Sequence, residues 1–187
     1  MKIKKSIAQF IFKVIGWQII GEKPSYKKFL LIIEPHTSNW DAVIGILAAY
    51  IFELKLKFII KAEVMFFPLN LILKPLGAIP IDRNRNKSLT KSNIDVICEK
   101  IESLEEAAIA ISVKGTRGKV NRLKTGFYYI AKKESIPICL GFADYKKKIA
   151  GIGDTYFVGE DFDSEVKRLN DFYKDKIGKH PENNFFK

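Results

Sequence analysis

Short apolar runs with the character of strands alternate with longer helical runs over most of this 187-residue chain. Strands are expected at residues 28–33, 58–61, 77–83, 107–113 and 136–142. Helices are expected at residues 41–53, 88–103, 125–133 and 164–177. This alternation predicts a single α/β domain in which a mostly parallel central sheet is flanked by helices. The length suffices for one such domain with a substantial core.

Three segments depart from the alternation. Two short strands near residues 146–152 and 155–158 are expected to form a small antiparallel extension that turns at glycines. The tail at residues 178–187 is expected to be loose. Residues 64–76 are apolar, are interrupted by two prolines and follow no clear period, so their structure is not predicted.

Polar residues with a possible catalytic role follow the end of the first predicted strand. His36 lies between the apolar run at residues 29–33 and the helical run that begins at Asp41. Many α/β enzymes keep catalytic groups at such a strand-to-helix junction. An imidazole can accept a proton near neutral pH, and a nearby carboxylate can fix its tautomer and stabilise its cation. His36 and Asp41 are therefore a candidate general-base dyad. The alternative is a helix cap beside an ordinary histidine.

Two further strand ends carry cations. Arg83 follows the strand near residues 77–83, and Lys114, Gly115, Thr116 and Arg117 follow the strand at residues 107–113. The carboxyl ends of parallel strands meet at one edge of a sheet, where ligands bind. Arginine and a flexible basic loop suit phosphate, whereas solvated loop charges are the alternative. The nucleotide-binding pattern GxxxxGK[ST] is absent.

Basic residues are concentrated before residue 29, where seven lysines face one acidic residue. Apolar residues recur there at helical spacing: Ile3, Ile7, Phe10, Ile11 and Val14. A basic amphipathic helix over residues 1–24 is therefore expected to associate with an anionic membrane surface. The alternative is a helix that packs on its own domain and shows lysines to water. Both can hold if the helix divides its apolar face.

Several classes of protein are disfavoured. The 32 basic and 21 acidic residues give a net charge of +11, which favours a polyanionic partner, but no nucleic-acid recognition motif is present.

Cys98 and Cys139 lie in apolar runs and are expected to be buried free thiols. We expect no metal site, no signal peptide and no membrane-spanning segment, since the longest apolar run covers only residues 42–52.

Four blocks together resemble one known family. Residues 36–41 match the H-x4-D block of the glycerolipid acyltransferases, the lysophosphatidic acid acyltransferase-like family. Residues 77–83 resemble the second block of that family, which ends in an arginine linked to the acceptor's phosphate. Residues 115–117 resemble the end of the third block, Pro-Glu-Gly-Thr-Arg, and residues 136–140 resemble the fourth, an apolar strand. The blocks follow in the family's order.

The resemblance implies transfer of a fatty acyl group from acyl-CoA or acyl carrier protein to the hydroxyl of a lysophosphatidate-like lipid. It implies that His36 is the general base and Asp41 its orienting carboxylate, and that Arg83 and Arg117, with the loop at residues 114–116, bind the phosphate. Residues 25–187 would form the acyltransferase domain, held peripherally on the cytoplasmic face of a membrane. No cofactor beyond the donor is implied. Residues 64–76 are open to two interpretations, an acyl-chain groove or plain core.

One position departs from the family's pattern. Val113 and Lys114 stand where the third block has Pro-Glu, which replaces a carboxylate with an ammonium. Three readings stay open: the change weakens catalysis and leaves a lipid-binding or membrane-binding relative, Lys114 adds a phosphate contact, or an ordinary enzyme carries an altered residue. The acceptor lipid, the donor, the acyl chain length and the oligomeric state are not predicted.

Overall fold

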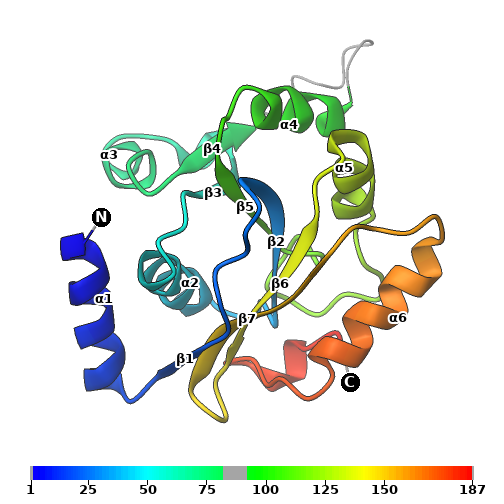
Figure 1. Ribbon diagram of the computed structural model, residues 1–187. Coiled ribbons are helices and arrows are strands. Elements are labelled where there is room, and N and C mark those ends of the chain that lie inside the picture. The colour runs from blue at the N-terminus through cyan, green and yellow to red at the C-terminus, as the bar shows by residue number, and fades with distance from the viewer. Residues whose placement is uncertain (1, 82–91, 187) are drawn as a thin grey trace.

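The computed structural model describes residues 2–81 and 92–186. Within these residues, seven strands form one sheet in the order β1-β7-β6-β2-β5-β3-β4 (Figure 1). The strands are β1 (Gln18–Ile20), β2 (Lys28–Glu34), β3 (Leu56–Lys61), β4 (Ala78–Ile81), β5 (Ala107–Ile111), β6 (Ile138–Asp144) and β7 (Ile149–Tyr156). Every neighbouring pair is parallel except β6 and β7. The predicted mostly parallel α/β sheet is confirmed.

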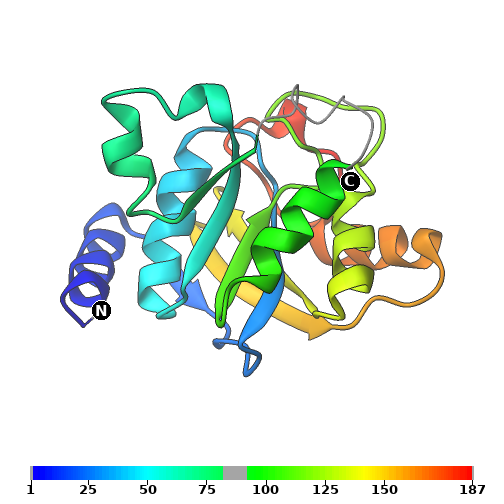
Figure 2. The same cartoon turned by 90° about the horizontal axis from the view of Figure 1, so that it is seen from above.

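Helices cover both faces of this sheet (Figures 1 and 2). They are α1 (Lys2–Ile15), α2 (Trp40–Ile51), α3 (Leu69–Leu73), α4 (Asn93–Glu102), α5 (Gly126–Glu134) and α6 (Phe162–Tyr173), with short 3-10 turns at Ala62–Val64 and Pro181–Asn183. Helices α1 and α2 lie over one face, and α4, α5 and α6 lie over the other. None of the helices within the described ranges has the length and apolar character needed to cross a bilayer.

Strand β2 is the middle strand of the sheet, and its side chains are buried on both faces. Phe29 and Leu31 belong to the core beneath α2, whereas Leu30 and Ile32 belong to the core shared with α4, α5 and α6. A strand covered by helices on both sides must be apolar at successive positions rather than at alternate ones. This requirement explains the unbroken apolar run that predicted the strand.

The register of the sheet brings the ends of two strands together. Residues 28–32 of β2 pair in parallel with residues 107–111 of β5. Both strands therefore end at the same edge, so the segment after Glu34 lies beside the segment that begins at Ser112. Strand β3 runs in the same direction, so α3 follows from this edge as well.

Two predictions about the ends of the chain are wrong. The N-terminal helix ends at Ile15, and residues 18–20 form the edge strand β1, paired with β7. The tail is packed: Phe186 is buried and stacks on Tyr173 at a ring-centroid distance of 5.4 Å. The Asn184 side chain also closes the tail on itself, since it accepts from the N–H of Gly178 and donates to the carbonyl of Lys176.

The predicted antiparallel extension at residues 146–158 is also different. Ile149–Tyr156 form one continuous strand, β7, antiparallel to β6. Its glycines permit close packing and do not mark turns. A Cβ atom on Gly151 would lie 2.5 Å from the Ile20 carbonyl oxygen, and one on Gly153 would lie 2.3 Å from the Phe172 ring. These positions exclude larger residues because neighbouring elements approach the backbone.

Candidate active site

His36 and Asp41 lie together at the carboxyl edge of the sheet. The Nδ1 atom of His36 is 3.2 Å from Oδ2 of Asp41; the histidine side chain is 22% exposed and the aspartate side chain 1% exposed. Asp41 is held by the first turn of α2, while His36 lies in the segment between β2 and α2, residues 35–39, here called the His36 loop. A proton on Nδ1 shared with the carboxylate leaves Nε2 as the basic nitrogen.

The Asp41 carboxylate is surrounded by donors. Its Oδ2 accepts hydrogen bonds from the backbone N–H groups of Thr37 (2.7 Å) and Ser38 (2.8 Å). Its Oδ1 accepts from the hydroxyl of Tyr145 at 2.8 Å. Burial raises the pKa of Asp41, but the bonds from His36, Ser38, Tyr145 and Thr37 together outweigh it and lower the pKa below its ordinary value. Asp41 is therefore ionised at neutral pH.

The helix-cap alternative describes only part of this geometry. Asn39 is the N-cap of α2 and makes no side-chain capping bond. The nearby Ser38 hydroxyl accepts from the N–H of Trp40 at 3.2 Å, so a local cap contact does exist. The Asp41 carboxylate, however, contacts the imidazole as well as backbone N–H groups. The same carboxylate therefore closes the loop and orients the histidine.

Glu34 holds the other end of the His36 loop. Its Oε2 accepts from the N–H of His36 at 2.9 Å, and its Oε1 accepts from the Ser112 hydroxyl at 2.7 Å. Burial raises the pKa of Glu34 more than these bonds and the charges of His36 and Lys114 lower it. This buried carboxyl group joins the end of β2 to the segment that follows β5.

Lys114 is buried, contrary to the expectation of an exposed phosphate ligand. Its side chain turns inward, and its Nζ atom donates to the carbonyl oxygens of His36 (3.2 Å) and Asn183 (2.6 Å). Burial lowers the pKa of Lys114, while the charges of Glu34 and Asp41 raise it. The C-terminal segment covers Lys114, and backbone carbonyls accept the hydrogen bonds of its ammonium group. In this conformation Lys114 therefore supports the His36 loop from inside the protein.

The C-terminal segment completes the support of the loop. The N–H of His180 donates to the Thr37 hydroxyl oxygen at 3.1 Å. A Cβ atom on Gly178 would lie 2.7 Å from that same hydroxyl oxygen, so the backbone of Gly178 packs closely against the Thr37 side chain. Nearby, the N–H of Tyr145 donates to the Ile177 carbonyl at 2.8 Å. Residues 176–186, here called the C-terminal brace, thus contact both the loop and the segment that carries Tyr145.

The other predicted ligands are placed differently. Gly115, Thr116 and Arg117 are exposed on the loop after β5, and Gly115 has a positive φ of 67° that favours glycine. Arg83 lies outside the described residues. Across residues 2–81 and 92–186, no group of three or more His, Cys, Asp or Glu side chains is arranged to hold a metal ion.

A cavity of about 450 Å³ lies away from His36. Its lining includes Leu56 at the start of β3 and residues 103–106, which precede β5. These residues mark the amino edge of the sheet, opposite the His36 loop. The cavity is therefore separate from the candidate active site.

The sequence did not reveal Glu34, Ser112 or Tyr145 as parts of the site. Glu34 carries a recognisable signal, because a carboxylate at the end of a buried apolar strand must be satisfied by partners in the fold. Tyr145 has no such signal, since 104 residues separate it from Asp41. Its position depends on the packing of the β6–β7 turn against Trp17, whose ring centroid is 5.0 Å from that of Tyr145.

Comparisons with known proteins bear on the fold and the family of the chain. No curated protein sequence matches the chain. Among solved structures, that of the 1-acyl-sn-glycerophosphate (LPA) acyltransferase PlsC from Thermotoga maritima is similar, with a TM-score of 0.64 and 16% identity over 91% of this chain and 75% of that one. Identity at this level shows a shared fold. The sequence model of the Acyltransferase family matches residues 16–139, which confirms the resemblance carried by the four blocks. The chain belongs to the acyltransferase family.

Proposed function

We propose that this protein is a membrane-associated acyltransferase that moves a fatty acyl group from acyl-CoA or acyl carrier protein to the hydroxyl of a lysophosphatidate-like lipid. One observation carries the proposal: the Nδ1 atom of His36 lies 3.2 Å from an Asp41 carboxylate that three other donors keep ionised. Membership of the acyltransferase family agrees with this chemistry.

The geometry suits direct transfer. Nε2 of His36 takes the proton of the acceptor hydroxyl as the hydroxyl oxygen attacks the thioester carbonyl carbon. A tetrahedral intermediate forms, and the carbon–sulfur bond then breaks. The departing thiolate takes the proton from the imidazolium, which returns His36 to its starting state. Asp41 stays ionised throughout and stabilises the imidazolium through Nδ1.

The cysteines have no place in this mechanism. Cys98 and Cys139 are buried in the core, and burial is the main cause that raises the pKa of the two thiols to about 12 and about 11. A thiolate is the reactive form of cysteine. Neither residue is a nucleophile at neutral pH, so direct transfer between donor and acceptor is the simpler route.

Phosphate recognition falls to the arginines. We assign the acceptor's phosphate to Arg83 and Arg117, with the backbone of Gly115 and Thr116, because guanidinium groups bind phosphate with paired hydrogen bonds. The exposed loop at residues 115–117 is open to such a ligand. Lys114 lies at the base of this loop, and its contribution is to hold the backbone of His36.

Helix α1 supports membrane association. Ala8 and Phe12 are buried, and Phe12 packs in a cluster with Ile44 of α2. Ile3, Phe10 and Val14 are 77%, 67% and 67% exposed on the same helix. The helix therefore divides its apolar residues between the domain and the outside. We assign the outward part, with the helix's lysines, to the interface of an anionic membrane on its cytoplasmic face.

The experiment that tests the function is acyl transfer by the purified protein. Labelled lysophosphatidate in anionic vesicles would be offered with acyl-CoA and, separately, with acyl carrier protein. Turnover is expected with at least one donor, and His36→Ala should abolish it while the protein stays folded. His180→Ala is the matched control, since it removes the chain's other imidazole but keeps the backbone N–H that contacts Thr37. Full activity in His36→Ala would refute the proposed base. Absence of turnover with both donors and with other lysophospholipids would favour a lipid-binding relative.

A further inference from the structure

The segment around α3 exposes an unusual number of large apolar side chains. Its two aromatic residues, Phe66 and Phe67, are 58% and 76% exposed. Leu69, Leu71 and Ile72 are exposed as well. No residue from 62 to 76 is buried, so the interpretation of residues 64–76 as plain core is wrong. These five side chains, here called the α3 patch, form an apolar surface that monomeric soluble proteins rarely leave bare.

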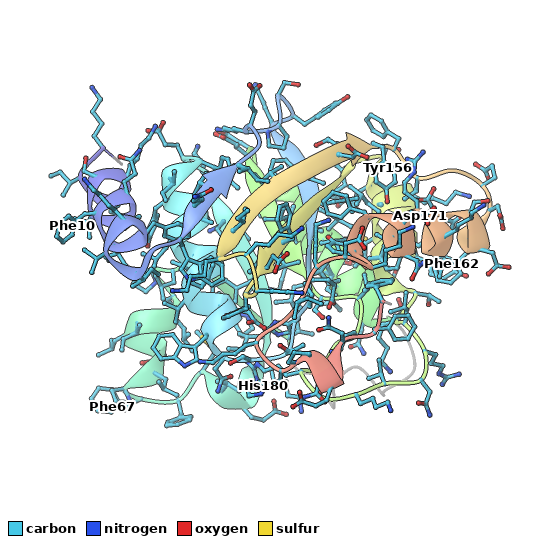
Figure 3. The ribbon with its side chains drawn as sticks, turned by 90° about the horizontal axis from the view of Figure 1, so that it is seen from below. Phe10, Phe67, Tyr156, Phe162, Asp171 and His180 are labelled. Atoms are coloured by element: carbon cyan, nitrogen blue, oxygen red, sulfur yellow. The ribbon has the colours of Figure 1, made fainter. Side chains whose placement is uncertain are left out.

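The α3 patch lies at the same end of the molecule as α1. In all three views, α1 and α3 occupy one end, opposite α6 (Figures 1, 2 and 3). Phe10 of α1 and Phe67 of the α3 patch both project outward there, away from Tyr156 and Phe162 (Figure 3). One flat surface can therefore contact both segments at once.

The patch also lies at the same edge of the sheet as the candidate active site. It follows the carboxyl end of β3, and the His36 loop follows the carboxyl end of β2, which points to the same edge of the sheet. A surface resting on the α3 patch would thus lie along the edge where the acceptor hydroxyl must arrive. Helix α1 alone does not fix this orientation, because a single helix lying in an interface leaves the domain free to tilt.

The charges beside the α3 patch indicate which kind of surface it contacts. Lys61 and Lys74 flank it and are exposed, and Glu63 is the only acidic residue between them. Helix α1 contributes four more lysines and no acidic residue, although one of them, Lys5, pairs with Glu53 of the domain at 2.9 Å. Exposed aromatic and aliphatic side chains bordered by lysines match the boundary between the headgroups and acyl chains of an anionic bilayer.

We propose that the α3 patch is a second membrane contact, which acts with α1 to set the carboxyl edge of the sheet against an anionic phospholipid bilayer. The proposal rests on the membrane association of α1 proposed above. It assigns a function to residues 66–72 that acyl-transfer chemistry alone does not require.

Single-cysteine labelling tests the contact without relying on turnover. Cys98 and Cys139 are 1% and 0% exposed, so a polarity-sensitive fluorophore would react selectively with an introduced surface cysteine. Phe67→Cys probes the patch and Ile7→Cys probes α1. Phe157→Cys is the matched control, since Phe157 is 54% exposed and follows Tyr156 at the opposite end (Figure 3). Vesicles of phosphatidylglycerol with phosphatidylcholine should shift the emission of the first two labels to the blue, and brominated lipid should quench them, while the third stays unchanged.

The labels distinguish failure of the α3 contact from failure of the α1 contact. A Phe67→Cys label that stays in water while the Ile7→Cys label enters the bilayer overturns the second contact and leaves the role of α1 intact. Labels that both stay in water overturn both contacts and leave the proposed chemistry untouched. A blue shift of the Phe67→Cys label that grows with protein concentration in the absence of vesicles assigns the patch to a second copy of the chain instead.

A binding measurement complements the labels. The double variant Phe66→Ser/Phe67→Ser should partition onto anionic vesicles at least about tenfold more weakly than the native protein, whereas Phe157→Ser should partition normally. Normal partitioning of the double variant would overturn the proposal.

Discussion

The Nζ atom of Lys114 lies 3.2 Å from the carbonyl oxygen of His36 and donates a hydrogen bond to it. The residue that departs from the family's third block therefore supports the backbone of the candidate base. Lys114 also reaches the carbonyl of Asn183, so a single buried ammonium joins the His36 loop to the C-terminal brace. A cation suits these two acceptors, whereas the family's glutamate would face oxygen atoms in this conformation.

Restoring the family residue should accordingly damage this protein. Lys114→Glu would place a carboxylate beside two carbonyl oxygens and near the buried Glu34, so the variant should lose about 3 kcal/mol or more of stability. Urea unfolding followed by circular dichroism measures the loss. Lys119→Glu, at an exposed position of the same loop, is the charge-matched control. A Lys114→Glu protein as stable as the native chain would show that the brace does not depend on the ammonium.

Asp41→Asn should reduce kcat by about 100-fold to 10,000-fold, with little change in the KM of the acceptor. An amide can no longer stabilise the imidazolium or fix the productive tautomer of His36. Steady-state kinetics with the donor that supports turnover measure the effect. Asp144→Asn provides the control, because Asp144 is a buried carboxylate that also accepts two backbone N–H bonds, from Lys146 and Lys147. Equal losses in both variants would indicate a purely structural effect.

Tyr145→Phe should lower kcat by about tenfold, since it removes one of the bonds that keep Asp41 ionised and leaves Oδ1 without that donor. The KM of the acceptor should not change. Burial and the adjacent Asp41 raise the pKa of Tyr145, so its hydroxyl stays a donor across the range of the assay. Tyr128→Phe is the comparison, because the Tyr128 hydroxyl bonds the carbonyls of Gly159 and Glu160 away from His36. Tyr128→Phe should lower the free energy of unfolding without lowering kcat. A loss of kcat in Tyr128→Phe but not in Tyr145→Phe would contradict the role given to Tyr145.

The stability of the α4–α5 contact should depend on pH through Asp95. The Lys133 ammonium, followed by the capping bonds of Ser92, lowers the pKa of Asp95 to about 2. A carboxyl group whose pKa is lower in the folded state stabilises the fold above its unfolded pKa of about 3.9, and this contribution is lost as the pH falls toward about 2. Asp95→Asn should therefore be less stable than the native protein at about pH 6, and the difference should shrink below about pH 4.

Chemical unfolding of both proteins between about pH 6 and about pH 3 measures this dependence. Repeating the series at about 1 M salt should reduce the difference, since salt screens exposed ion pairs. A difference that stays constant across the range would show that the Asp95 carboxylate does not contribute as an ion.

The fold was largely predictable because its signals are local. The apolar run of β2 and the turn into α2 placed His36 and Asp41 at one junction, and the structure brings these side chains into contact. Their catalytic roles stay predictions. Gly151 and Gly153 misled the prediction of β7, because a glycine that lets Ile20 or Phe172 approach looks in sequence like a glycine that turns the chain.

The rest of the site depends on tertiary packing. Nothing near Tyr145 in the sequence points to Asp41, and nothing in the tail points to Thr37. Lys114 was correctly assigned to the loop after β5, but the direction of its side chain is decided by the brace that covers it. Burial of a charged side chain is a property of neighbours distant in sequence, so a local pattern does not reveal it.

The contact between His180 and Thr37 joins residues 143 positions apart, and this separation has a consequence for synthesis. A ribosome adding about 5–20 residues per second needs roughly 7 to 30 seconds to pass from Thr37 in the His36 loop to His180 in the C-terminal brace. Throughout that interval the His36 loop lacks the hydrogen bond from the N–H of His180 to Thr37, although the local bonds to Asp41 can already form. Residues 176–186 are translated after the His36 loop, so the contact between the loop and the C-terminal brace forms only once both have been synthesised.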